Sequence, residues 1–185
     1  MTTLPTTILL ILQPFSKMFS NKRSWTLACF LFVPLILVKG SRTVCRLIRF
    51  AGLKGERSFD RYHKLLNRAN WNMLKGSKIL LQTILRTSSK EKAIYIAIDE
   101  HLERRRGPKI KAIGCYRDAV LSTNRRKVKS FGLKWMSVAV LKSFSWSKNV
   151  FALPFLTVLT RSKKGDRKIG RRHKSTPDWI CQIVK

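Results

Sequence analysis

Acidic side chains are scarce in this chain of 185 residues, which has 9 Asp and Glu against 39 Lys and Arg. The formal net charge is +30 at pH 7. Such an excess of positive charge requires an anionic partner, and nucleic acid and an anionic membrane surface are the two candidates. Hydrophobic residues make up 44% of the chain, which does not suggest a disordered polycation of the histone-tail kind. The length allows one ordinary domain, or a small helical domain with part of a second.

Clustered cysteines are also lacking. The four cysteines are far apart in sequence, no C-x-x-C pair occurs, and the three histidines do not fall at zinc-ligand intervals from them. This pattern favours reduced thiols over a zinc site or a disulfide framework. It indicates a reducing compartment.

No apolar run reaches the roughly 20 residues that a membrane-spanning helix needs. The run at residues 25–38 contains Pro34 and is flanked by basic residues on both sides, so we expect a buried core helix there. The apolar stretch at residues 4–15 has no basic residue before it and no small-residue cleavage site, unlike a signal peptide. A small membrane-associated protein, anchored by these two segments, stays open as a less favoured alternative.

Basic amphipathic segments follow. The pattern predicts a short helix that Ser41 caps and Gly52 ends, a second helix from about Ser58, and a third over residues 71–86. The first two helices, with a Gly-containing turn between them, resemble a helix-turn-helix over residues 41–69. On the second helix, three basic residues are expected on one outer face: Arg61, Lys64 and Arg68.

These helices predict a helical, DNA-binding region over residues 1–88. A basic helix face is also typical of an ordinary solvated surface, and that alternative stays open. The polar stretch at residues 87–92 marks the expected boundary with a second region over residues 93–185.

Asp99 follows the apolar run at residues 93–98, which is expected to be a central strand covered on both faces. We expect Asp99 to leave this strand at its carboxyl end. In a basic environment, a carboxylate at that place is suited to hold a divalent metal. The alternative is a loop carboxylate that forms an ion pair with the arginines after it. Glu100 is expected to project to the other side, and Glu103 to pair with a neighbouring arginine.

Two further strands are predicted at residues 134–142 and 150–159, forming an antiparallel hairpin. Pro154 lacks a backbone donor, which puts the second strand at a sheet edge or bulge. After a very basic turn at residues 161–174, Ser175 or Thr176 with Pro177 is expected to begin a helix. The predicted fold class is α+β.

Several blocks of the sequence resemble insertion-sequence transposases of the DDE endonuclease superfamily, in matching order and spacing. They include KGSRTVCRLIR, FDRYHKLLNRANW, AIDEHLERRRGPKIKA, CYRDAV, GLKWMSVAVL and GRRHKSTPDW. The resemblance implies an RNase H-like catalytic domain, here incomplete, with three antiparallel strands and then a helix. It identifies Asp99 as the first of three catalytic, metal-binding acidic residues. The other two are not found, so an amino-terminal fragment is expected, inactive alone.

In complete relatives the resemblance implies Mg²⁺-dependent DNA strand cleavage and transfer, in which two magnesium ions are held by the three carboxylates. Asp118 is expected to be a turn carboxylate outside this triad. The expected partners are DNA at transposon ends, and the missing carboxy-terminal half or a homo-oligomer. The expected location is the cytoplasm of a bacterial or similar cell, with the nucleoid. The basic residues expected to bind DNA phosphates in the second region are Arg104, Arg105, Arg106, Lys109, Lys111, Arg125, Arg126, Lys127, Arg171 and Arg172. A non-catalytic, basic nucleic-acid-binding protein stays open as the main alternative.

Overall fold

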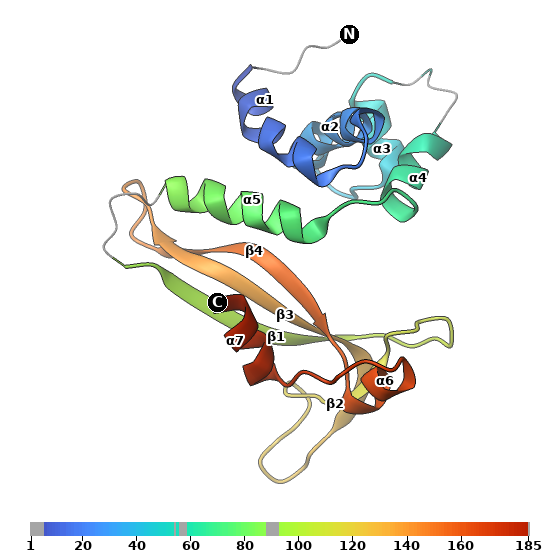
Figure 1. Cartoon of the computed structure of the whole chain (residues 1–185), viewed down its shortest axis with the longest axis vertical. Helices are drawn as coiled ribbons and strands as arrows, with labels where there is room; N and C mark the ends of the chain where they lie inside the picture. Colours follow the sequence, from blue (N-terminus) through green and yellow to red (C-terminus); the bar gives the residue numbers. More distant parts are fainter. Residues whose placement is uncertain (1–5, 54, 56–58, 88–92, 185) are drawn as a thin grey trace. The chain divides into compact units, whose positions relative to one another are not determined.

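The computed structural model describes residues 6–53, 55, 59–87 and 93–184 (Figure 1). The chain divides into two compact units, Met1–Thr83 and Ile84–Lys185. The first contains helices and the second an antiparallel sheet with two short helices. The predicted α+β class, with amino-terminal helices, then strands, then a carboxy-terminal helix, is confirmed.

The helices of the first unit are α1 (Thr6–Leu12), the 3-10 helix η1 (Gln13–Met18), α2 (Lys22–Leu37), α3 (Val44–Phe50), α4 (Asp60–Asn67) and most of α5 (Met73–Arg86). Asn21 caps α2 by accepting a hydrogen bond from the Ser24 amide at 2.7 Å. Thr43, and not Ser41 as expected, caps α3. Gly52 follows α3 with φ +78°, a conformation that suits glycine at a helix end.

The core of this unit joins residues from η1, α2, α3 and α4. Its buried members are Met18, Phe19, Ala28, Leu31, Val38, Leu47, Ile48, Tyr62 and Leu65. Phe19 stacks on Trp71 with ring centroids 5.3 Å apart. The apolar run at residues 25–38 is therefore helical, but only partly buried, since Ile36 is 70% exposed. None of the helices in the described ranges has the length and hydropathy of a membrane-spanning segment.

The sheet of the second unit is built around one long strand, β3 (Lys129–Ser143). β1 (Tyr95–Arg104) pairs antiparallel with one edge of β3. The other edge pairs with β2 (Gly114–Arg117) and, further along, with β4 (Val150–Thr160), both antiparallel. The predicted hairpin of the strands at 134–142 and 150–159 is confirmed as β3 and β4.

The register of β3 and β4 shifts between Val138 and Ala139, because Val138 lies opposite Leu156 whereas Ala139 lies opposite Pro154. The extra residue, Phe155, is buried. Pro154 therefore lies beside a β-bulge, as its missing amide hydrogen predicts. The core of the sheet is the middle of β3, where Met136, Val138 and Val140 are at most 1% exposed.

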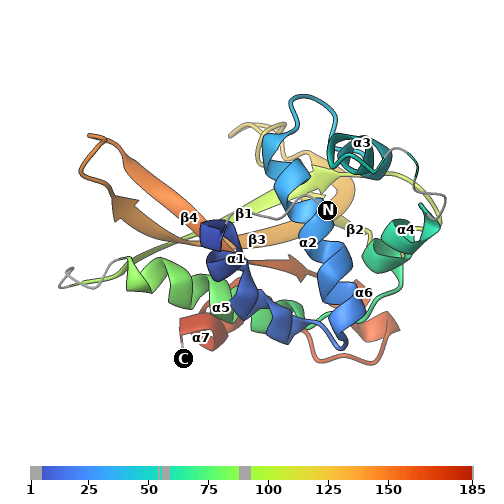
Figure 2. The same cartoon turned by 90° about the horizontal axis from the view of Figure 1, so that it is seen from above.

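Two helices complete the second unit, α6 (Lys163–Lys168) and α7 (Thr176–Val184). α7 lies over one face of the sheet (Figures 1 and 2). It begins at Thr176 before Pro177, as predicted. The expected basic turn at residues 161–174 is only partly irregular, because α6 forms within it. Ser162 caps α6 by accepting a hydrogen bond from the Gly165 amide at 3.1 Å.

Candidate active site and nucleic-acid interface

Asp99 lies in the middle of β1, directly opposite Ser137 of β3. The expectation that Asp99 ends its strand is wrong, because β1 continues to Arg104. The pairing continues because β3 is long enough to match β1 as far as Gly132. Asp99 is an exposed side chain. Within the described ranges, its carboxylate forms no hydrogen bond or ion pair.

The expected burial of residues 93–98 on both faces is also wrong. Ala93, Ile94, Tyr95 and Ile96 are exposed, and among the described strands β1 pairs with β3 alone. An apolar run can form an edge strand as well as a central one, because the residue types of a strand do not determine how many strands pair with it.

Glu103 shares the face of β1 that carries Asp99, because side chains alternate along a strand. Its carboxylate accepts a hydrogen bond from Trp135 Nε1 at 3.0 Å and one from Arg105 Nε at 2.9 Å. The Trp135 bond, together with Arg105, lowers the pKa of Glu103. Glu103 is therefore fixed as a structural carboxylate, paired with an arginine as predicted.

Glu100 lies on the opposite face of the sheet, beneath α7. Lys134 Nζ lies 2.8 Å from one Glu100 carboxylate oxygen, and Thr176 Oγ1 donates to the other at 2.7 Å. Burial alone raises the pKa of Glu100, but the hydrogen bonds from Lys134 and Thr176 outweigh it, so the pKa lies below its usual value. This contact ties the start of α7 to the sheet and separates Glu100 from Asp99.

Asp118 follows β2 and is 2% exposed. Arg104 donates to both of its carboxylate oxygens, from Nε at 2.6 Å and from Nη2 at 2.9 Å. The amides of Val120 and Leu121 donate to Oδ1 at 3.1 Å each. The Arg104 guanidinium is the main cause that holds the pKa of Asp118 well below its usual range. Asp118 thus anchors its turn, and Arg104 is its partner.

The other residues of this unit that were expected to bind DNA lie at one end of the sheet. β1 ends, β3 begins and β4 ends there, since all three pairs are antiparallel. The segments 105–113, 118–128 and 161–175 leave the sheet at this end (Figure 1), which we call the basic end. Its exposed side chains include Arg106, Lys109, Lys111, Arg125, Arg126, Lys127, Arg171 and Arg172.

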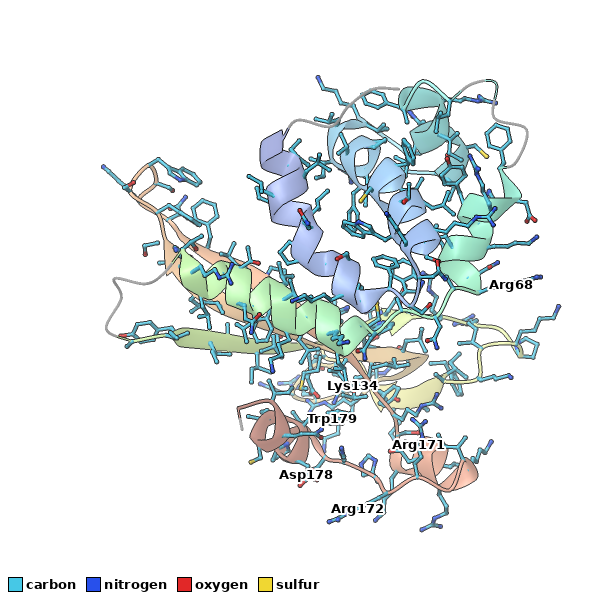
Figure 3. All side chains as sticks on the ribbon, turned by 45° about the horizontal axis from the view of Figure 1, so that its top comes forward. Arg68, Lys134, Arg171, Arg172, Asp178 and Trp179 are labelled. Carbon is cyan, nitrogen blue, oxygen red and sulfur yellow. The ribbon has the colours of Figure 1, made fainter. Side chains whose placement is uncertain are left out.

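The segment that carries Arg171 and Arg172 is held by Asp166 of α6. The Arg171 amide donates to the Asp166 carbonyl at 3.0 Å, and His173 Nδ1 lies 2.8 Å from Asp166 Oδ2. Further on, Lys174 Nζ lies 4.7 Å from the centre of the Trp179 ring. Figure 3 labels both arginines between α6 and α7. The two acidic side chains of the basic end, Asp118 and Asp166, are thus buried and paired internally.

In the first unit, the three expected DNA-binding residues of α4 differ in their surroundings. Arg61 is half-buried, with its guanidinium 5.2 Å from the Tyr62 ring centre. Lys64 forms an ion pair with Asp60, and Arg68 is exposed (Figure 3). Of the three residues, Arg61 is therefore less exposed than expected. The helix turns Arg61 partly inward beside Tyr62, a core residue.

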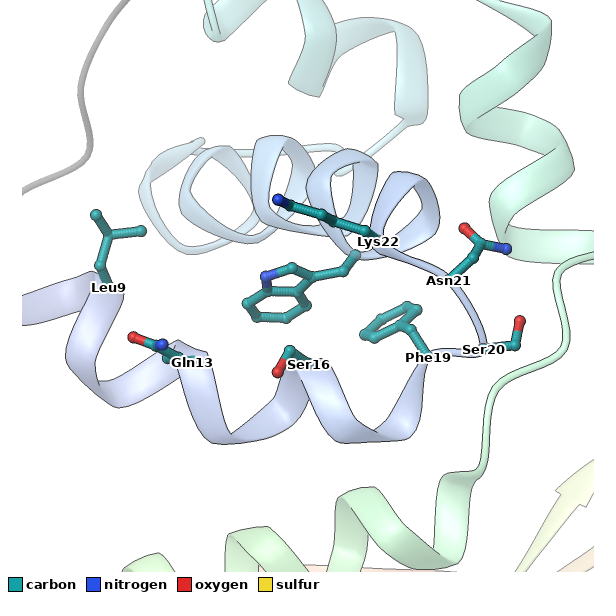
Figure 4. A pocket seen from close by; sticks show the side chains of 8 residues that line it. Leu9, Gln13, Ser16, Phe19, Ser20, Asn21 and Lys22 are labelled. Carbon is teal, nitrogen blue, oxygen red and sulfur yellow. The ribbon is translucent and has the colours of Figure 1, made fainter.

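Arg61, Lys64 and Arg68 nevertheless line one hollow, together with Arg23 of α2. Arg23 was missed by the sequence-based prediction, because its proximity to α4 depends on how α2 packs in the bundle. A second hollow of this unit is lined by side chains of α1, η1 and the start of α2, seen in Figure 4. Its lining residues are Leu9, Gln13, Ser16, Phe19, Ser20, Asn21, Lys22 and Trp25. Among its described lining residues, Lys22 is the ionisable one.

The donor set for a metal is incomplete among the described residues. No group of three or more His, Cys, Asp or Glu side chains lies close enough together there to hold a metal ion. Magnesium prefers several oxygen ligands in octahedral geometry, and Asp99 offers one carboxylate. The residues described here therefore do not form a complete magnesium site.

Comparison with curated proteins and comparison with solved structures each gave no match. Comparison with family models gave a match to the DDE superfamily endonuclease family over residues 14–185. Enzymes of this superfamily act on DNA and generally use a divalent metal. The match spans both units, from η1 to the last residue, and the chain belongs to the DDE superfamily of endonucleases.

Proposed function

We propose that this protein acts in DNA transposition, as a transposase that binds DNA and contributes Asp99 as a metal-binding catalytic carboxylate. One observation supports this choice above the others. Of the acidic residues on β1 and in the turn after β2, Glu100, Glu103 and Asp118 are held by cationic partners. Asp99 is exposed and has no hydrogen-bond or ion-pair partner among the described residues. It is therefore the carboxylate that remains available for a ligand.

The pairing of β1 with β3 supports a catalytic role for Asp99, because it holds the backbone of Asp99 in place. β1 is paired with β3 on both sides of Asp99, from Tyr95 to Arg104. A site on a paired strand is held more rigidly than a site on a loop. The divalent metal, proposed to be Mg²⁺, would stabilise the charge that develops on phosphate oxygens during strand cleavage.

The described residues do not supply the further oxygen ligands that the metal needs. We propose that these ligands come from a segment that carries the remaining carboxylates of the family, or from a second copy of the chain. Without that partner, the chain is proposed to bind DNA and not to cleave it.

The DNA-binding proposal rests on the distribution of charge. The basic end of the sheet and the hollow beside α4 both present Lys and Arg side chains, and phosphate contacts of this kind dominate affinity for DNA. We propose that the natural ligands are transposon ends. We also propose that the protein is found with the nucleoid.

The test combines the chain with a polypeptide that carries the remaining family carboxylates, fused or in trans, and measures Mg²⁺-dependent nicking of end-labelled DNA. Asp99→Asn should lower nicking by more than about 100-fold, because even the outer-shell partners of metal ligands contribute about 10- to 100-fold. DNA affinity should remain unchanged. The matched control is Glu100→Gln, on the opposite face.

Nicking that survives Asp99→Asn would contradict the role of Asp99. DNA binding without nicking, whatever carboxylate-bearing partner is added, would support the alternative of a non-catalytic nucleic-acid-binding protein. Nicking by the 185-residue chain alone, lost on Asp99→Asn, would show that its own residues complete the site.

A further inference from the structure

The turn between β3 and β4, together with the start of β4, carries a cluster of three aromatic rings, formed by Phe144, Trp146 and Phe151. The centroids of Phe144 and Trp146 are 5.2 Å apart with an interplanar angle of 22°. Phe151 contacts both, with centroid distances of 5.6 Å to Phe144 and 5.1 Å to Trp146. We call these three residues the aromatic platform. Figure 2 shows that the hairpin projects from the rest of the sheet.

The platform is held in place by the hairpin itself. The Ser147 amide donates to the Phe144 carbonyl at 3.0 Å, which closes a turn with Trp146 at its third position. Beneath it, Lys142 Nζ lies 5.4 Å from the centre of the Phe144 ring and donates to Thr87 Oγ1 at 2.6 Å. Rings that are already ordered lose little conformational entropy when a ligand binds.

Trp146 is 72% exposed, although its ring packs against two other aromatic rings. A large aromatic side chain is not kept at a turn by burial when most of its surface remains in water. The contacts of Trp146 therefore orient its ring without covering it. Packing against the described residues thus leaves most of the Trp146 ring in contact with water.

The hairpin that carries the platform contains lysines and no acidic residue. Lys148 follows Trp146 by two residues and is exposed. No Asp or Glu occurs anywhere from residue 119 to residue 165. A protein surface with charges of both signs would not be attracted strongly by this positive charge. A phosphate next to a base that stacks on the ring would be.

We propose that the aromatic platform is a binding site for an unpaired nucleic-acid base, which stacks on Trp146 while Lys148 contacts an adjacent phosphate. Stacking on aromatic side chains suits any base, because every base has a π face, and it is combined with basic groups in proteins that bind single strands. In a duplex the same faces are already covered by neighbouring bases. The platform therefore distinguishes unpaired from paired nucleotides.

The position of the platform gives it a defined place relative to Asp99. Ser137, opposite Asp99, lies six residues before Ser143, where β3 ends. At about 3.4 Å per residue, Ser137 and the end of β3 are about 20 Å apart along the strand. A base bound at the platform would thus lie about six base-pair steps of 3.4 Å from a strand held at Asp99. Base stacking itself does not depend on the proposed catalytic function.

The experiment measures the affinity of the full chain for a fluorescently labelled 12-nucleotide single strand and for the matching blunt duplex, by anisotropy at fixed salt. Trp146→Ala should weaken binding of the single strand about 10-fold, within the range that stacking contributes per base, and change duplex binding less than about 2-fold. Trp146→Phe should retain most of the affinity. Phe30→Ala is the control, since Phe30 is an exposed aromatic residue (38%) on α2, outside the basic end and the hairpin.

Equal losses for the single strand and the duplex, or no loss for either, would overturn the proposal. A change in self-association of Trp146→Ala with unchanged single-strand binding would instead show that the platform contacts protein. Should Trp146→Ala not fold, quenching of tryptophan fluorescence by oligo(dT) is compared between the wild type and Trp146→Phe. An identical quenched fraction would likewise overturn it. Failure of the nicking test leaves these outcomes unaffected, because none of them involves Asp99.

Discussion

Four carboxylates near β1 have the same chemistry but different surroundings. Glu100, Glu103 and Asp118 each accept hydrogen bonds from cationic or polar side chains, whereas Asp99 is exposed on its strand. A carboxylate that is already hydrogen-bonded to an arginine has to lose that partner before it can bind a metal. The free energy needed to break such a pair favours Asp99 as the metal ligand. The paired carboxylate of Asp118 instead stabilises the fold.

Asp118→Asn tests that role through the pH dependence of stability. The pKa of Asp118 in the folded protein lies below its unfolded value of about 3.9. The ionised side chain therefore stabilises the fold above about pH 4, and this contribution is lost as the pH falls towards the folded-state pKa. Asp118→Asn should lower Tm by several degrees at pH 7 and reduce the further fall of Tm between pH 5 and pH 3.

Thermal melts followed by circular dichroism give both quantities. Asp60→Asn is the control, because its ion pair with Lys64 is exposed to solvent and is expected to contribute little. A wild-type protein and an Asp118→Asn variant with the same Tm at every pH would show that the Arg104–Asp118 pair has no net effect.

At this scale, sequence reasoning selected Asp99, assigned Asp118 to a turn and paired Glu103 with an arginine. It could not separate Arg104 from Arg106, because the two differ only in a tertiary contact. Arg104 faces Asp118, fourteen residues away, and nothing in the local pattern of charges predicts that encounter. The half-buried position of Arg61 has the same origin, since it depends on the packing of Tyr62 in the core.

Among the elements, β3 determines the arrangement of the sheet, because the other three strands all pair with it. At Gly132 it is paired on both edges, with Arg104 of β1 and Gly114 of β2. A Cβ atom built on Gly132 would lie 2.3 Å from the carbonyl oxygen of Glu103. That contact is with backbone, so no side-chain rotation can relieve it. A glycine is therefore required here for the strands to approach.

Gly132→Ala should destabilise the protein by about 1–3 kcal/mol, the usual cost of forcing additional atoms into a packed region. Urea unfolding followed by circular dichroism measures the change. Gly55→Ala is the matched control, because a Cβ at Gly55 meets nothing within 4 Å. If both variants unfold at the same urea concentration as the wild type, the close approach of β1 and β3 at Gly132 is not as described.

The elements that sequence patterns predicted are those with long hydrophobic signals, such as the helices over residues 25–38 and 71–86 and the β3–β4 hairpin. β2 and α6 were missed for physical reasons. β2 has four residues and exists through its pairing with β3. α6 has the sequence KKGDRK, which lacks an apolar face, and its stability comes from the Ser162 cap and from the contact of Asp166 with His173.

For the whole molecule, the dominant property is charge. The net charge of +30 is distributed over both units, with concentrations at the basic end of the sheet and in the hollow beside α4. Long-range attraction to a polyanion follows from this distribution before any specific contact forms. It also predicts repulsion between copies of the chain at low ionic strength.

Affinity for duplex DNA should therefore fall steeply with salt. If about six to ten phosphates are neutralised, the association constant should decrease by about 10³- to 10⁵-fold between 50 and 200 mM salt. Filter binding or anisotropy over this range measures the slope. Replacing Arg125, Arg126 and Lys127 together by Gln should reduce the slope by up to about three phosphate contacts. An association constant that barely changes over the range would contradict a phosphate-based interface.

β1 also has a second edge, which pairs with no strand among the described residues. A strand that added to this edge would meet Asp99 with one particular residue, and only every second residue of that strand would share the face of Asp99. A shift of one position would move its side chains to the face of Glu100 and Lys134, where the carboxylate is already paired. The hydrogen-bond register between β1 and the added strand would thus decide whether a second carboxylate lies beside Asp99 or on the opposite face of the sheet.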